Sequence, residues 1–137
     1  MVHAEIEIIN LKDLHMAEAN LLDKDEIRRM HITALVDTGA WLLCINENIQ
    51  SYLNLPFIEK RRFRTADDQI IEYDVVGPVE LRYADRKTPC NAFVLPGDSE
   101  PLLGAVPMEE LDVIIHPLRQ ELHVNSECHR YPTLKPI

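Results

Sequence analysis

The tripeptide Asp37-Thr38-Gly39 places a carboxylate directly after an apolar run that ends at Val36. A charged group in apolar surroundings is costly unless hydrogen bonds or a second group compensate for it. Two interpretations fit this pattern. The tripeptide can form a tight turn, in which Asp37 accepts backbone hydrogen bonds and Gly39 adopts a positive φ. It can also supply a carboxylate for acid–base chemistry, and the tripeptide alone does not decide between the two.

The elements on either side are predicted to hold this tripeptide at the end of a strand. Polar and apolar side chains alternate over residues 29–36, which is the period of a half-buried strand. Beyond the tripeptide, residues 41–45 (WLLCI) predict a short buried strand. Asn46 can then cap a helix over residues 47–55, which a proline ends.

The other segments are short and separated by turn signals, so the chain is predicted to be mainly β with two short helices. Residues 10–27 are weakly patterned and are interpreted as a long hairpin or excursion. The second helix is expected near Pro107, with acidic residues in its first turn. The further predicted strands cover residues 3–9, 61–65, 70–76, 77–83, 88–95, 113–115 and 121–124.

Composition indicates one soluble globular domain: 137 residues, 46% hydrophobic and 27% charged. The net charge of −9 argues against nucleic acid as a partner. The one basic cluster, residues 59–64, is bracketed by acids and is expected to be a solvated strand face. No apolar stretch approaches the roughly 18 residues of a membrane span, and the first residues lack the pattern of a secretory signal. We therefore expect no membrane partner.

Three cysteines are an odd number, which fits free or buried thiols in a reducing cytoplasm better than a disulfide framework. Cys44 could act as a nucleophile, but no histidine is near it in the sequence, so a buried structural thiol is expected. His123, Cys128 and His129 could ligate a metal. They lack paired spacing and a fourth ligand, so a strand end and a polar tail are expected there, with no metal and no cofactor.

Two motifs together carry a resemblance to a known family. ALVDTGA, residues 34–40, precedes an apolar strand and a helix, and LLGAVPMEELDVIIHP follows from Leu102. The chain resembles the retropepsin-like aspartic proteases, most closely the small bacterial group of clan AA. The resemblance implies a closed β-barrel, the acid-protease half-fold, with one or two short helices over residues 1–124. Residues 125–137 would form a polar tail.

The resemblance also assigns roles to residues. Asp37 would be the catalytic carboxylate, in an active-site loop with Thr38, Gly39 and Ala40. Leu102, Leu103 and Gly104 would pack beneath that loop. The residues expected to form the flap, a hairpin that closes over substrate, are Thr65, Ala66, Asp67 and Asp68.

This sequence departs from the family pattern at three places. Trp41 stands where relatives more often carry a small or polar residue, and it could crowd the cleft or a subunit contact. The flap tip has no glycine, which bears on how the flap moves. His116 replaces an acid that is common in relatives and is expected to be a surface change.

Aspartic proteolysis uses two carboxylates, one ionised and one protonated, with a water between them. This chain has one Asp-Thr-Gly, and Asp98 lies in a polar loop without a following apolar strand. The second carboxylate would come from a second copy across a two-fold axis, which Thr38 spans in the resembling family. The predicted function is thus a homodimeric aspartic endopeptidase acting on peptides. The alternative is a dimeric peptide-binding or scaffolding module of the same fold with little or no hydrolysis.

Overall fold

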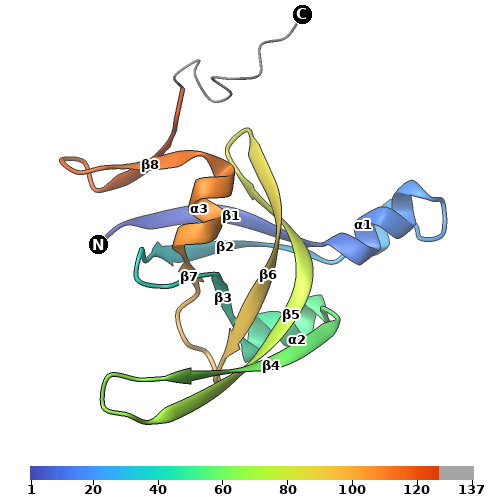
Figure 1. Cartoon of the computed structure of the whole chain (residues 1–137). Coiled ribbons are helices and arrows are strands. Elements are labelled where there is room, and N and C mark those ends of the chain that lie inside the picture. The colour runs from blue at the N-terminus through green and yellow to red at the C-terminus, as the bar shows by residue number, and fades with distance from the viewer. Residues whose placement is uncertain (127–137) are drawn as a thin grey trace, which may run out of the picture.

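The structure is a computed structural model, and it describes residues 1–126 (Figure 1). The chain is mainly β, as predicted. Its strands are β1 (His3–Asn10), β2 (Arg29–Val36), β3 (Leu43–Asn46), β4 (Phe57–Arg64), β5 (Ile70–Tyr83), β6 (Arg86–Leu95), β7 (Leu102–Leu103), β8 (Val113–His116) and β9 (Glu121–Val124). Its helices are α1 (Leu11–Glu18), α2 (Glu47–Leu53) and α3 (Ala105–Leu111), with a short 3-10 helix at Lys24–Glu26.

Seven strands form one sheet in the order β1-β2-β7-β3-β6-β5-β4. An antiparallel pairing between β1 and β5 closes this sheet into a barrel, and β4 continues outward as one arm of a long hairpin with β5. Two pairs are parallel, β2 with β7 and β3 with β6. Strands β8 and β9 form a separate two-stranded sheet near the end of the described chain.

The barrel is filled by apolar side chains that alternate inward along β1, β2, β3 and β5. Burial of this surface is the main stabilising contribution to such a fold. A second, smaller apolar cluster lies beside the main core and includes parts of the β4–β5 hairpin. It consists of Cys44, Val75 and Phe93, with the partly buried Leu42, Phe63, Tyr73, Leu95 and Leu102 packed against them.

Strand β5 is longer than the sequence indicates. Two strands meeting at residues 76–77 were predicted, because a glycine and a proline follow each other there. The structure instead carries one strand from Ile70 to Tyr83 through this point. A register shift against β6 between Val76 and Val79 leaves Pro78 outside the ladder, so its missing N–H costs no strand hydrogen bond.

The prediction for residues 10–27, a hairpin or excursion, missed a helix, α1, within this segment. Asn10 caps α1 by accepting a hydrogen bond from the Asp13 N–H at 3.1 Å. Its amide also donates to the Leu53 carbonyl at 3.0 Å, which ties the start of α1 to the end of α2. The helix is thus specified by its cap and not by an apolar period, and Asn10 with Asp13 three residues later is the signal that could have found it.

A buried ion pair closes the loop formed by α1 and the 3-10 helix. Asp13, 4% exposed, accepts hydrogen bonds from Arg28 Nε at 2.8 Å and from Arg28 Nη2 at 2.9 Å. The Arg28 N–H also donates to Asp13 at 3.0 Å. These hydrogen bonds to the guanidinium hold the pKa of the Asp13 carboxyl below its usual range. The ion pair therefore ties α1 to Arg28, the residue that precedes β2.

We predict that Asp13→Asn destabilises the protein by about 1–3 kcal/mol at pH 7, since it leaves Arg28 without its ionised partner. Because folding lowers the pKa of Asp13, the wild-type contribution is full above about pH 4 and is lost as the pH falls through the folded value. The difference between the two proteins in urea unfolding should therefore shrink on acidification. Asp74→Asn, which breaks the exposed pair with Lys60, is the control and should destabilise the protein much less than Asp13→Asn does. Equal urea midpoints for wild type and Asp13→Asn at pH 7 would contradict this.

Candidate active site

Asp37 lies at the end of β2, where the short strand β7 supports the chain. Leu35 and Val36 pair in parallel with Leu102 and Leu103. The Asp37 N–H continues this ladder by donating to the Leu103 carbonyl at 3.0 Å. The backbone of the carboxylate-bearing residue is therefore fixed by the Leu-Leu segment that sequence analysis placed beneath it.

The chain then turns tightly around the Asp37 side chain. The Gly39 N–H donates to Asp37 Oδ1 at 2.9 Å, and the Ala40 N–H donates to the Asp37 carbonyl at 3.1 Å. Asp37 is half-buried, whereas Thr38 is exposed. Within residues 1–126 no hydrogen bond reaches Oδ2, so one oxygen is oriented by the loop and the other is open to a ligand. The tripeptide thus forms a turn around the carboxylate, as predicted, but the positive φ expected for Gly39 was wrong: among the described glycines only Gly77 and Gly97 have one.

Two glycines favour this arrangement: an added Cβ would be crowded at residue 39 and would clash with backbone at residue 104. A Cβ on Gly39 would lie 3.1 Å from Asp37 Oδ1, against the oxygen that its N–H orients. A Cβ on Gly104 would lie 2.3 Å from the Leu42 carbonyl oxygen and 2.7 Å from that of Ala40. Gly104 thus lets the start of α3 approach the loop to within backbone contact.

That contact is completed by two backbone hydrogen bonds. Ala105 and Val106, in the first turn of α3, donate their N–H groups to the carbonyls of Ala40 and Trp41 at 2.9 and 3.0 Å. The free N–H groups at a helix start need such acceptors. The loop that carries Asp37 is consequently held from both sides, by β7 and by α3.

Cys44 lies close enough to the candidate site to respond to its charge. Burial, and secondarily the negative charge of Asp37, raise the pKa of the Cys44 thiol to about 11. A thiol with that pKa is protonated at neutral pH and is not a nucleophile. Burial likewise raises the pKa of Cys90 to about 12. Both are free thiols, and Cys128 lies outside the described residues.

Thr65, Ala66, Asp67 and Asp68 form the tip of the β4–β5 hairpin, where the flap was predicted. The Thr65 N–H donates to the Gln69 carbonyl at 2.8 Å, and the Asp68 N–H donates to the Thr65 carbonyl at 3.0 Å. Asp68 has a φ of 65°, so an aspartate takes the left-handed position that a glycine would otherwise occupy. Its carboxylate also pairs with Arg64.

The inner face of this hairpin contacts the region of the candidate site. On β4, Arg61 and Phe63 are partly buried while their neighbours are exposed. The Phe63 ring packs edge-on against Phe93 at 5.1 Å between centroids, and the Arg61 guanidinium lies 5.3 Å from the centroid of the Trp41 ring. In Figure 1 the hairpin and the loop after β2 extend toward the same side of the barrel. The contacts of Phe63 and Arg61 thus hold the hairpin against the segment that follows Asp37.

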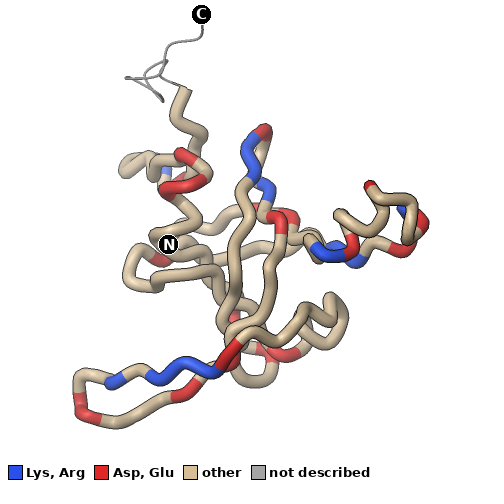
Figure 2. The backbone as a smooth tube through the Cα atoms, turned by 45° about the vertical axis from the view of Figure 1, so that its right-hand side comes forward, with Lys and Arg blue, Asp and Glu red and all other residues tan. Residues whose placement is uncertain are grey.

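Charges on the hairpin are largely compensated. Figure 2 shows the basic residues of β4 in a row, with acidic residues at the tip and on β5. Lys60 pairs with Asp74 at 3.0 Å and Arg62 with Glu72 at 3.2 Å. The basic cluster predicted as a solvated strand face is therefore neutralised across the hairpin.

Acidic and histidine clusters elsewhere lie away from Asp37. Asp23, Asp25 and Glu26 lie close together, but all three are exposed. His123 is hydrogen-bonded to Glu121 at 2.9 Å, and its ring lies 5.5 Å from that of His116 on the same hairpin. Cys128 and His129, proposed with His123 as possible metal ligands, lie outside the described residues.

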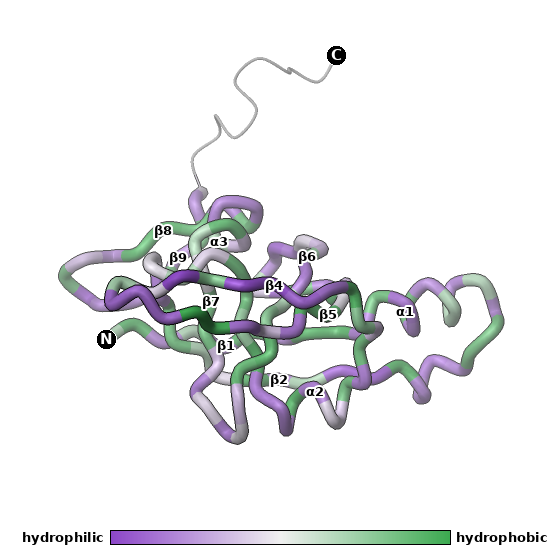
Figure 3. The backbone as a smooth tube through the Cα atoms, turned by 60° about the horizontal axis from the view of Figure 1, so that its bottom comes forward, coloured by the Kyte–Doolittle hydropathy of each residue, from purple (hydrophilic) through white to green (hydrophobic). Residues whose placement is uncertain are grey.

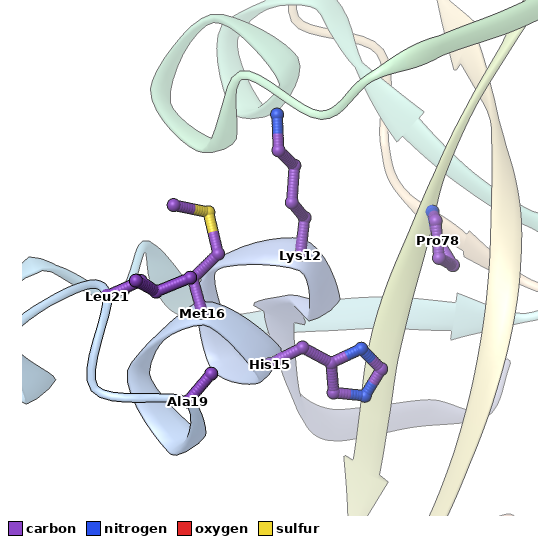
Figure 4. Close-up of a pocket in the computed structure, with 6 residues that line it drawn as sticks. All are labelled: Lys12, His15, Met16, Ala19, Leu21 and Pro78. Carbon is purple, nitrogen blue, oxygen red and sulfur yellow. The ribbon is translucent and has the colours of Figure 1, made fainter.

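A hollow of about 390 Å³ lies between α1 and Pro78 (Figure 4). Its lining is mostly apolar, with Lys12 and His15 among it. It borders the segment before β2, whereas Asp37 follows the other end of that strand. This hollow is therefore separate from the candidate site.

An apolar face adjoins Thr38. A hollow of about 310 Å³ is lined by Thr38, by α3 and by the β8 residues Val113, Ile114 and Ile115. Ile114 is 54% exposed. Figure 3 shows the apolar stretch of β8 beside α3. The exposed Thr38 is thus continuous with uncovered apolar surface. In residues 1–126 no helix is long and apolar enough to cross a membrane.

Among solved structures, the solution structure of the protease of simian foamy virus (mac) is similar, with a TM-score of 0.50. The alignment covers 78% of this chain and 91% of the viral chain at 19% sequence identity. Because the two sequences are only 19% identical, this similarity supports the fold and not the function. The fold is retropepsin-like. No protein-family model and no curated protein matches the sequence.

Placed on the retropepsin-like barrel, the sequence-predicted residues fall into two groups. The structure brings Asp37, Thr38, Gly39 and Ala40 together with the Leu-Leu-Gly segment, and it places the flap residues at the tip of a separate hairpin. Sequence analysis noted Trp41 but missed Arg61, its partner. The signal available for Arg61 was its inward position in the strand alternation, since it shares that face with Phe63.

We predict that Gly104→Ala destabilises the protein by about 3 kcal/mol or more, because backbone atoms on both sides must move to admit the new methyl group. Gly97→Ala is the matched control: nothing lies within 4 Å of the added Cβ, so only its positive φ is unfavourable, at roughly 1–2 kcal/mol. Thermal and urea unfolding of both variants would measure the difference. Equal losses would show that the close approach at Gly104 is not a constraint.

Proposed function

We propose that the chain is an aspartic endopeptidase that acts as a homodimer, with Asp37 of each copy forming one catalytic dyad. The observation that carries this proposal is the environment of the Asp37 carboxylate. Asp37 is half-buried at a strand end, with Oδ1 held by the Gly39 N–H and Oδ2 receiving no hydrogen bond from residues 1–126. The retropepsin-like fold supports this role for a carboxylate at this place.

In the proposed reaction a water lies between the two carboxylates. The ionised one accepts a proton as the water oxygen attacks the peptide carbonyl, while the protonated one donates a hydrogen bond to the carbonyl oxygen. The tetrahedral intermediate then re-forms the carbonyl and expels the amine, which takes its proton from the carboxyl that had accepted one from the water, so the dyad again holds one proton.

The proposal requires a second copy, and the surface around Thr38 supports one. The exposed Thr38 adjoins the apolar hollow between α3 and β8, with Ile114 largely uncovered. Apolar surface of this kind is favourably buried on association. A two-fold axis beside Thr38 would bring two Asp37 side chains together and cover both copies of this face.

Substrate would bind as an extended strand between the hairpin and the loop that carries Asp37. Backbone groups would hold the peptide, and side-chain pockets would set preference.

Two further features enter the proposal. The resemblance to the small bacterial group is the basis for a flap at Thr65–Asp68, for a domain over residues 1–124 and for a tail over residues 125–137. The free thiols of Cys44 and Cys90 favour a reducing compartment, and we propose the cytoplasm.

The second candidate function is a dimeric peptide-binding module with little hydrolysis. It is favoured by the contacts that hold the hairpin: Arg61 stacks on Trp41, and the tip is fixed by Thr65 and by the Arg64–Asp68 pair. A hairpin held in this way would bind a peptide but close over it less readily.

We predict that Asp37→Asn abolishes peptide hydrolysis while the protein stays folded and dimeric. The amide has nearly the same shape as the carboxylate, but it cannot take the proton of the attacking water. Asp98→Asn removes a carboxylate from an exposed loop and should leave the rate unchanged. Cleavage of a mixed peptide library, with circular dichroism and ultracentrifugation on each variant, would test this. Near-wild-type cleavage by Asp37→Asn would exclude the proposed mechanism, and intact peptides with wild type would favour the binding module.

A second prediction links pH to assembly. Two adjoining carboxylates retain one proton at a pH where two separate ones are ionised, above about pH 5. The dimer then binds more protons than two free chains, so mild acidification should strengthen dimerisation. The net charge of −9 on each chain acts in the same direction. Hydrolysis should follow a bell-shaped pH profile with an acidic maximum.

Asp37→Asn separates these two contributions, because it removes the shared proton and hardly changes the net charge. Sedimentation equilibrium at several pH values should show a weaker pH dependence of the dimer dissociation constant for the variant. Identical dependence in both proteins would rule out a proton shared at Asp37.

A further inference from the structure

Trp41, the sole tryptophan of the chain, directly follows the turn that holds Asp37. Its side chain is 53% exposed, although tryptophan is largely buried in most proteins. The residue also departs from the pattern of the resembling family. A large exposed ring beside a candidate active site is a potential contact for ligand.

The backbone around Trp41 is rigidly held. The carbonyls of Ala40 and Trp41 both accept hydrogen bonds from the first turn of α3, and Gly104 packs against the Ala40 and Leu42 carbonyls. The ring is therefore presented from a fixed base. A rigid aromatic group loses little conformational entropy when a ligand packs on it.

Arg61 reaches Trp41 from the hairpin. Its guanidinium carbon lies 5.3 Å from the ring centroid, which is cation–π geometry. Arg61 Nη2 also donates to Glu59 Oε1 at 2.6 Å, so its charge is already compensated. One side of the indole is thus covered by Arg61, while about half of the side chain remains exposed to a ligand.

We propose that Trp41 is a specificity-determining residue that selects peptides with an aromatic side chain, stacked on the exposed part of the indole while Arg61 supports the ring from the hairpin. Offset or edge-on ring pairs are favourable beyond the apolar area that they bury. An acidic side chain is not expected there, because Glu59 neutralises Arg61 and the chain carries a net charge of −9.

The position of Trp41 relative to Asp37 also indicates which residue of a bound peptide should contact the ring. The turn from Asp37 to Ala40 spans less than about 7 Å between its end Cα atoms, and an extended peptide advances about 3.3 Å per residue. The preferred aromatic residue should thus lie about two or three residues from the scissile bond. In a two-fold dimer both copies of Trp41 are present, so the preference should appear at equal distances on both sides.

This inference rests on the proposed function in so far as it needs a cleft that takes peptide, but it does not need hydrolysis. Binding is therefore measured with Asp37→Asn protein, using uncharged ten-residue peptides of Ala, Ser and Thr with a fluorophore at one end. One peptide carries Phe at the third residue on each side of its centre, and the other carries Ala there. Fluorescence anisotropy gives both affinities, and the emission of Trp41 reports contact with its ring.

The Phe peptide should bind about tenfold more tightly than the Ala peptide and should change the Trp41 emission. Adding Trp41→Ala should bring the two affinities together, Trp41→Phe should restore most of the difference, and Arg61→Gln should reduce it. Tyr52→Ala, which removes an exposed ring on α2, should leave the preference intact. Equal affinities, a preference that survives Trp41→Ala, or no binding of either peptide would each overturn the inference.

The same peptides incubated with wild-type protein separate this inference from the proposed function. A Phe preference in binding without any cleavage would overturn the endopeptidase and leave the role of Trp41 standing. Cleavage of both peptides at equal kcat/KM, with equal affinities, would leave the endopeptidase standing and overturn the role of Trp41.

Discussion

The candidate site depends on a close approach that is possible only because residue 104 has no side chain. At Gly104 the chain passes from β7 into α3 within contact distance of the carbonyls of Ala40 and Leu42. This approach lets β7 extend the ladder of β2 to the Asp37 N–H and lets α3 hydrogen-bond the other end of the loop. The position of the carboxylate is therefore set by backbone contacts, and the side chains around it are free to differ without moving it.

The same arrangement leaves part of the candidate site without a contact from residues 1–126. Oδ1 of Asp37 accepts the Gly39 N–H, Oδ2 receives no hydrogen bond from the described residues, and the exposed Thr38 borders apolar surface on α3 and β8. The half-buried charge and the uncovered apolar area are both unfavourable in an isolated monomer, so both favour a partner. One structural cause, a rigid loop presented at the surface, accounts for both.

The sequence predicted the parts of the molecule in which local pattern and long-range packing agree. The alternation up to Val36, the cap at Asn46 and the Leu102–Gly104 segment all lie where they were predicted, because each is specified by residues that contact one another in the fold. Helix α1 was missed because its specification is a cap and an ion pair to Arg28, not an apolar period. The contact between Trp41 and Arg61 could not be predicted, since it depends on the three-dimensional path of a hairpin that begins sixteen residues after the tryptophan.

The exposed hairpin has a consequence for the behaviour of the protein in concentrated solution. Strand β4 is an edge strand of the described sheet, and Phe57 and Ile58 at its start are exposed. An unpaired edge with apolar residues is a template for uncontrolled strand addition between molecules. Charged side chains occupy the rest of this edge, among them Lys60, Arg62 and Arg64, and pairing two such edges would remove them and their acidic partners from water. The basic residues of β4 thus act as gatekeepers against aggregation, which lets the edge stay open without becoming the start of a fibril.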